Sequence, residues 1–160
     1  MKRLINRQVS LKPQDLLILL KISKPNNTFL SYAELVEQLV ISASEVHASI
    51  NRAKFAHLII SSSDNEMRTS KVNLREFILY GAKYVFPATF GSITRGLPTS
   101  YAAAPLRNII MQPNELPPVW PYPNGSTRGQ AYYPLYPTAP IAAEKDSFLY
   151  EVLALFDAIR

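Results

Sequence analysis

The stretch that decides the fold is "SYAELVEQLVISASEVHASINRAKFAHLI", residues 31–59. It contains two copies of the pattern S-x-x-E, at Ser31–Glu34 and at Ser42–Glu45. In this capping box the serine side chain accepts a hydrogen bond from the backbone N–H of the glutamate, and the glutamate side chain accepts one from the backbone N–H of the serine. Each copy therefore marks a helix N-terminus. Apolar residues recur three and four positions apart after each start. Two short helices joined by a tight turn form a helix-turn-helix.

Further helices are expected on both sides of this stretch. The segment "LKPQDLLILLKIS", residues 11–23, is rich in leucine and has Pro13 in its first turn, where the missing N–H costs nothing. Residues 74–86 show helical spacing of apolar side chains, and we expect Asn73 and Glu76 to cap them. A proline follows directly and ends this helix.

A β-hairpin is expected between the second and the last of these helical regions. Residues 58–61 and 67–72 are strand-like, and the polar residues 62–66 between them favour a turn. The order helix, helix, helix, hairpin, helix over residues 10–86 resembles the winged helix-turn-helix DNA-binding domain, in particular that of MarR-type bacterial regulators. The resemblance implies that residues 42–55 are the recognition helix and that the hairpin is the wing.

The resemblance also implies which side chains contact DNA. A recognition helix enters the major groove with its first turns, where hydroxyl, amide and basic groups reach phosphates or base edges. The residues that we expect to contact DNA are Ser42, Ser44, His47, Asn51, Arg52, Lys54, Arg68 and Lys71. For His47, packing on the preceding helix is an equally good interpretation. Lys2, Arg3 and Arg7 would add phosphate contacts as an N-terminal arm.

Several residues of this region fit DNA binding less well. Glu45 lies on the face presented to DNA, although capping is its expected role. Ala48 stands where MarR-type recognition helices often carry a long basic residue, and the wing tip holds Asp64 and Glu66. Phe55 lies opposite the core and is too large to expose without a reason, so it would cover another element or a partner. Winged domains also serve as protein-binding modules, and these residues favour that alternative.

The second half of the chain has a different composition. Eleven of the thirteen prolines lie from Pro87 onward, so regular elements are excluded for most of this half. Its many tyrosines, with Val119, Trp120 and Leu135, would be costly to leave in water. We therefore expect an extended arm over residues 87–143 that wraps the winged domain or a partner protein.

Two similar segments stand out within this arm, "GSITRG" at 91–96 and "GSTRG" at 125–129. Arg95 and Arg128 each follow a threonine and precede a glycine. Such segments could bind a phosphate through the arginine and backbone N–H groups. The favoured interpretation is two similar turns in which each arginine bonds to nearby carbonyl groups.

The chain ends with an amphipathic helix over residues 144–160, for which Asp146 is the expected cap. Its apolar stripe consists of Phe148, Leu149, Val152, Leu153, Phe156 and Ile159. The stripe can pack on the chain's own core. Alternatively it can form a homodimer, as helices flanking the winged domain do in MarR-type proteins.

Charge and composition narrow the function classes. The net charge is +5, and all of the excess lies in residues 1–86, which hold 12 basic and 7 acidic residues. A basic half favours an anionic partner, with nucleic acid as the leading candidate. The chain has no cysteine, which excludes disulfides and cysteine zinc sites. It shows no signal peptide and no apolar run long enough for a membrane span, so we expect a cytoplasmic protein without membrane contact.

These patterns together predict a mainly α fold with a small β-hairpin wing. It would comprise a winged helix-turn-helix domain (1–86), a Pro/Tyr-rich extended arm (87–143) and a C-terminal amphipathic helix (144–160). The expected function is sequence-specific binding of double-stranded DNA by a homodimeric transcriptional regulator, a repressor. The alternative is an antitoxin-like or accessory subunit that binds a partner protein through its winged domain and arm. Because no nucleotide-binding, hydrolase or metalloprotease motif occurs, we expect neither enzymatic activity nor a cofactor or metal.

Overall fold

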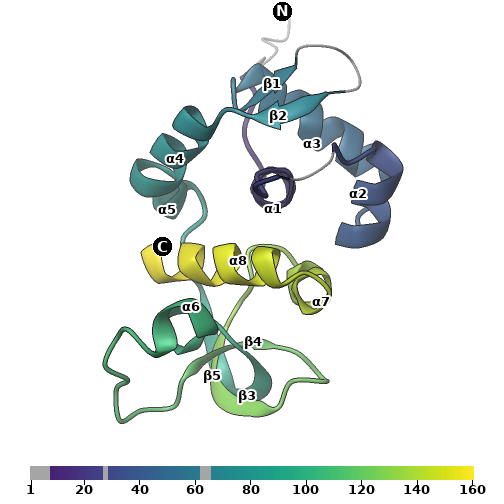
Figure 1. Ribbon diagram of the computed structural model, residues 1–160. Coiled ribbons are helices and arrows are strands. Elements are labelled where there is room, and N and C mark those ends of the chain that lie inside the picture. Colours follow the sequence, from purple (N-terminus) through teal and green to yellow (C-terminus); the bar gives the residue numbers. More distant parts are fainter. Residues whose placement is uncertain (1–7, 27–28, 62–65) are drawn as a thin grey trace, which may run out of the picture.

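A computed structural model describes residues 8–26, 29–61 and 66–160 (Figure 1). The helices are α1 (Pro13–Ile22), α2 (Tyr32–Leu39), α3 (Ala43–Phe55), α4 (Lys71–Tyr80), α5 (Ala82–Val85), the 3₁₀ helix η1 (Ser100–Ala102), α6 (Ala104–Arg107), α7 (Ala139–Glu144) and α8 (Ser147–Ile159). The strands are β1 (Ile59–Ser61), β2 (Met67–Thr69), β3 (Phe90–Pro98), β4 (Pro118–Pro121) and β5 (Thr127–Tyr132). No helix within the described residues is long and apolar enough to cross a bilayer.

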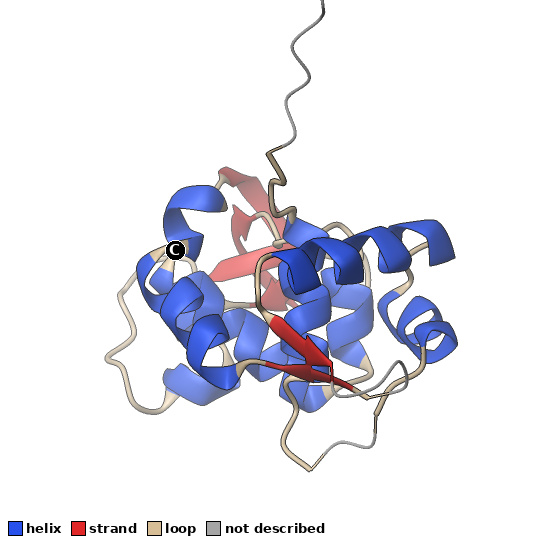
Figure 2. Ribbon diagram, turned by 90° about the horizontal axis from the view of Figure 1, so that it is seen from above, coloured by secondary structure: helices blue, strands red, loops and turns tan. Residues whose placement is uncertain are grey.

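The elements are stacked in three tiers (Figure 1). The helix-turn-helix α2–α3 and the hairpin β1–β2 lie at one end, α8 crosses the middle, and β3–β5 with α6 lie at the other end. Figure 2, viewed from the hairpin end, shows β3–β5 behind the helices. The predicted order of three helices, hairpin and helix is confirmed for the first half.

The capping signals explain where most of these helices begin. Ser31 and Glu34 form the predicted capping box at the start of α2. Ser42 accepts from the backbone N–H of Glu45 and so caps α3. The cap predicted for α4 was wrong: the hydroxyl of Ser70 accepts from the backbone N–H of Asn73, so α4 begins three residues earlier than expected.

The prediction of a mainly α fold was wrong, because the chain is mixed α/β. The predicted extended arm forms three strands that close into a small barrel. β3 pairs antiparallel with both β4 and β5, and β4 pairs parallel with β5. The prolines that argued against strands stand at strand ends: Pro98 ends β3, and Pro118 and Pro121 bound β4. At these positions a missing N–H does little harm to the ladder.

Closing a barrel with only three strands requires very close backbone approach. A Cβ atom on Gly96 would lie 1.8 Å from the carbonyl oxygen of Trp120. A Cβ on Gly129 would lie 2.1 Å from the carbonyl oxygen of Pro117, and one on Gly125 would lie 2.2 Å from the carbonyl carbon of Gly96. Three of the five glycines of the chain are therefore fixed by barrel closure.

α8 packs against elements on both sides of it, α1 on one side and η1 and α6 on the other. The five consecutive residues 16–20 of α1 are all buried, because α3 lies on one side of α1 and α8 on another. α8 contributes the buried side chains Leu149, Leu153 and Phe156. On its barrel side, Tyr150 packs edge-to-face on Trp120, with ring centroids 5.6 Å apart. Of the two alternatives for the apolar stripe of this helix, packing on the chain's own core is observed for these buried residues.

A buried carboxylate, that of Asp157, ties α8 to the barrel. Its Oδ2 accepts from Thr99 Oγ1 and from Trp120 Nε1, both at 2.6 Å. Its Oδ1 accepts from Arg160 Nε at 2.9 Å. Burial raises the pKa of the Asp157 carboxyl, and the bonds from Arg160, Thr99 and Trp120 oppose this. The barrel and the C-terminal end of α8 therefore meet at a hydrogen-bonded polar centre.

Gly96→Ala should disrupt the barrel, because the new methyl group would collide with the Trp120 carbonyl. We expect a loss of about 3 kcal/mol or more in the free energy of unfolding, measured by urea denaturation. Gly81→Ala is the matched control, since its Cβ would lie 3.2 Å from the ring and 3.3 Å from the carbonyl oxygen of Phe77, far less crowded than at Gly96, and should change stability by less than about 1 kcal/mol. Equal stability of Gly96→Ala and wild type would contradict the barrel geometry.

The other end of α8 is held by Asp146, which caps the helix as predicted. Its Oδ1 accepts from the backbone N–H of Leu149, and its Oδ2 lies 2.5 Å from Nζ of the buried Lys21 in α1. Burial raises the pKa of this carboxyl, but the bonds from Lys21 and Leu149 and the charge of Lys24 outweigh burial and lower it below 3.8.

A lowered carboxyl pKa makes stability depend on pH in a defined direction. The stabilisation by Asp146 is present above its ordinary pKa and is lost as the pH falls through the lower folded-state pKa. Wild type should therefore be more stable than Asp146→Asn at pH 6, and the difference should shrink below about pH 4. Urea denaturation of both proteins between pH 6 and 2 measures this. A difference that stays constant over that range would show that Asp146 is not ionised in the folded protein.

Candidate nucleic-acid interface

α3 has one face in the core and one face toward solvent. Val46, Ile50 and Ala53 are buried against neighbouring elements, which include α1 and α2. The opposite face includes the exposed residues Ser42, Ser44, His47, Asn51 and Phe55. β3–β5, which form from the predicted arm, lie at the other end of the molecule and do not cover this face of α3 (Figures 1 and 2).

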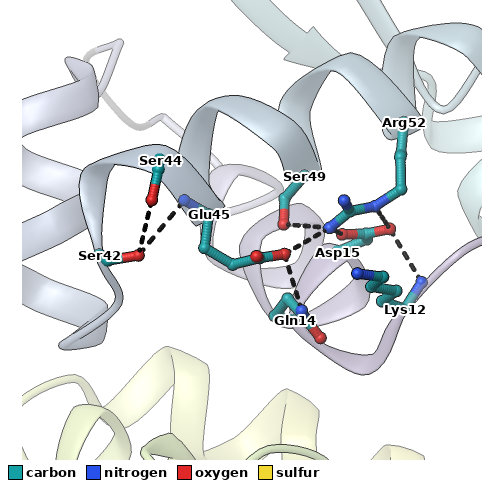
Figure 3. Close-up of polar contacts among 8 residues, drawn as sticks. All are labelled: Lys12, Gln14, Asp15, Ser42, Ser44, Glu45, Ser49 and Arg52. Carbon is teal, nitrogen blue, oxygen red and sulfur yellow. Dashed lines mark hydrogen bonds and ion pairs between the residues drawn. The ribbon is translucent and has the colours of Figure 1, made fainter.

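Arg52 holds α3 against α1 (Figure 3). Its Nε and Nη2 donate to both carboxylate oxygens of Asp15, at 2.8 and 2.7 Å. Nη2 also donates to Glu45 Oε1 at 2.7 Å and to Ser49 Oγ at 3.0 Å. The side chain of Asp15 is completely buried, and 16% of the Arg52 side chain is exposed. This is a bidentate ion pair that is largely shielded from solvent, and it orients α3 relative to α1.

The Arg52 network bears on two sequence-based assignments. Arg52 was expected to contact DNA, but its Nε and Nη2 are bound within the protein, so this geometry does not support that assignment. Glu45 was expected to complete a capping box, but its carboxylate accepts from Arg52 and from Gln14 Nε2, at 2.7 and 2.8 Å. The bonds from Arg52 and Gln14 lower the pKa of Glu45. The charge that seemed to oppose phosphate is therefore paired with Arg52.

Sequence reasoning missed Asp15, which is the centre of this network. It also accepts from the backbone N–H of Lys12 at 2.9 Å and so satisfies the start of α1. The signal was present in the segment "PQDLLILL", where one carboxylate stands at the head of a fully apolar run. Its partner Arg52 lies 37 positions away in the chain, beyond the reach of local patterns.

The other predicted contacts on α3 remain on the solvent face. Ser42 and Ser44 are exposed, with their hydroxyls 3.3 Å apart at the start of the helix (Figure 3). His47 stacks on Tyr32 of α2, with ring centroids 4.1 Å apart and planes at 16°, so it packs on the preceding helix while its other side stays exposed. Asn51 is exposed and Lys54 is partly exposed, and neither has a side-chain partner within the described residues.

Arg68 and Lys71 form a separate group. Both line a hollow of about 350 Å³ between the end of α1 and the hairpin, and Lys24 lies in the same hollow. The guanidinium of Arg68 lies over the ring of Phe29, 5.0 Å from its centroid. Within the described part of the chain no α3 residue lines this hollow, so the eight predicted DNA contacts do not form one cluster. The wing-tip residue Asp64 and the N-terminal residues Lys2, Arg3 and Arg7 lie outside the described residues.

The α3 end of the molecule also exposes large apolar side chains. The exposed fractions are 66% for Phe55, 59% for Ile60 of β1 and 48% for Val40 in the turn before α3. Within the described residues Phe55 therefore covers no other element of the chain, which was one of its two expected roles; the other, covering a partner, stays a prediction.

Comparisons with known proteins leave the family open. No protein-family model, no curated protein and no solved structure matches this chain.

Arg52→Ala should destabilise the protein, because it would leave the buried Asp15 carboxylate without its ionic partner. We expect a loss of roughly 3 kcal/mol, measured by urea denaturation at pH 7. Lys54→Ala on the same helix is the matched control and should change stability by less than about 0.5 kcal/mol. If Arg52→Ala were as stable as wild type, the ion pair would not be what orients α3.

Proposed function

We propose that this chain is a sequence-specific double-stranded DNA-binding transcriptional regulator, a repressor, that places α3 in the major groove. The observation that carries the proposal is that α3, the second helix of a helix-turn-helix, keeps a polar solvent face. Hydroxyl, imidazole, amide and amine groups all lie on this face. These are the groups with which recognition helices contact phosphates and base edges. The excess of basic residues in the first half supports the same partner.

The proposed roles follow from position along α3. Ser42 and Ser44 lie at the helix start, where the free N–H groups and the helix dipole favour a phosphate. Asn51 is two turns further along and has the side chain suited to a paired contact with adenine. Lys54 supplies a phosphate contact through charge. Arg52 acts indirectly, by holding α3 at a fixed angle.

A homodimer belongs to this proposal, since a two-fold DNA site needs two recognition helices. An apolar groove of about 490 Å³ runs between α4 and α8. It is lined by Ile78 and Leu79 of α4 and by Leu155 and Ile159 of α8, among others. Leu155 and Ile159 are both 38% exposed, so a second copy would bury further apolar area there.

The test is DNA binding by fluorescence anisotropy on a duplex selected from a random pool. Wild type should bind with an affinity that falls steeply with salt, since phosphate contacts release counterions. Asn51→Ala should lose about 1–3 kcal/mol of binding free energy for the selected duplex and should discriminate less against other sequences. Lys54→Ala should weaken binding to all duplexes to the same extent, and it should reduce the slope of log affinity against log salt concentration by about one. Sedimentation should find two chains for each duplex.

Arg107→Ala is the control for this experiment, because Arg107 is an exposed cation on α6, at the other end of the molecule. It should bind DNA like wild type. If Arg107→Ala weakened binding as much as Lys54→Ala, or if binding did not depend on salt, α3 would not be the DNA-contacting element. One chain for each duplex would contradict the homodimer.

A second candidate function is binding of a partner protein, as in an antitoxin-like or accessory subunit. The exposed apolar side chains of Phe55, Ile60 and Val40 favour it. Large exposed apolar groups are typical of protein–protein interfaces, whereas they gain little against the charged surface of DNA. A folded protein that selects no duplex and binds none at low salt would support this candidate over the first.

A further inference from the structure

The two Thr-Arg-Gly segments noted in the sequence lie against each other in the structure. Residues 94–96 belong to β3 and residues 127–129 to β5, and the two strands pair antiparallel. The register pairs Thr94 with Gly129, Arg95 with Arg128, and Gly96 with Thr127. The segments are therefore related by a local two-fold axis, with the two arginines directly opposite each other. The interpretation as two separate turns was wrong.

Barrel closure explains the glycines of this motif but does not explain the arginines. Gly96 and Gly129 are buried and face β4, where no side chain fits. Arg95 and Arg128 alternate with them along the strands, so they point to the outer face, where both are exposed. Any polar residue would serve the fold at these outward positions.

The pair is unfavourable for the protein alone. Like charges at directly opposed positions of an antiparallel ladder destabilise it, and their Cβ atoms lie about 5 Å apart. Within the described residues neither guanidinium has a hydrogen-bond, ion-pair or aromatic partner. The expectation that each arginine bonds to nearby carbonyl groups is therefore wrong for the described part of the chain. Two unpaired arginines are held side by side on a rigid strand pair.

We propose that Arg95 and Arg128 form a binding site for a phosphoryl group. Each guanidinium presents a planar fork of donors that matches two oxygens of a phosphate, and an anion near the two-fold axis would be held from both sides. Its charge would also remove the repulsion between the arginines. The pair lies on the barrel, at the opposite end of the molecule from α3 (Figure 1). A duplex held by α3 would not occupy it, so the site is independent of the proposed DNA contact.

The test is thermal unfolding of the full chain with increasing inorganic phosphate, with chloride at matched ionic strength as the reference. A ligand that binds only the folded protein raises the melting temperature in a saturable way. Wild type should show this rise. Arg95→Gln and Arg128→Gln should each weaken phosphate binding about tenfold or more, because each removes charge-assisted hydrogen bonds. Arg95→Lys keeps the charge but not the fork and should also bind more weakly.

Stability without phosphate separates this role from a structural one. Because the arginines repel each other, Arg95→Gln and Arg128→Gln should melt no lower than wild type in chloride alone. Arg107→Gln is the matched control and should respond to phosphate like wild type. The proposal is overturned if phosphate gives no saturable rise, or if all four variants respond alike.

Dimethyl phosphate distinguishes two sources of the phosphoryl group, since it resembles the diester link of a nucleic acid. If it binds as tightly as inorganic phosphate, the site takes a phosphodiester. If only inorganic phosphate binds, the site takes a phosphate monoester. Both results support a phosphoryl site on the barrel, and neither depends on whether α3 binds DNA.

Discussion

The carboxylate of Asp157 joins three parts of the chain through hydrogen bonds. It receives hydrogen bonds from Thr99 just before η1, from Trp120 in β4 and from Arg160 at the C-terminus. A buried indole N–H without an acceptor would cost roughly 1–3 kcal/mol. The barrel therefore buries its tryptophan against α8, and this bond helps to fix the position of β3–β5 relative to that helix.

The sequence predicted those parts of the fold that depend on neighbouring residues. The cap of Ser31 and the hairpin are encoded within a few positions, and the structure confirms them. The barrel could not be predicted, because prolines stand at the ends of β3 and β4 and because the pairing of its strands depends on contacts between distant segments. The role of Arg52 was missed for the same reason, since its partner Asp15 lies on another helix.

The middle tier gives the molecule two ends of different character. At one end, α3 and the hairpin present polar side chains together with exposed apolar ones such as Phe55. At the other end, the barrel carries the paired arginines on a half of the chain with as many acidic as basic residues. α8 contacts α1 on one side and η1 and α6 on another, so it is the physical link between the two ends.

The ion pair between Arg52 and Asp15 has a consequence for how α3 would bind any partner. A helix that is fixed before binding loses little conformational freedom on binding, so less of the interaction energy is spent on ordering it. The same rigidity means that α3 cannot tilt to suit differently shaped surfaces. A partner would have to match the geometry that the ion pair sets, and selectivity would then arise from shape as well as from the few polar groups on the helix.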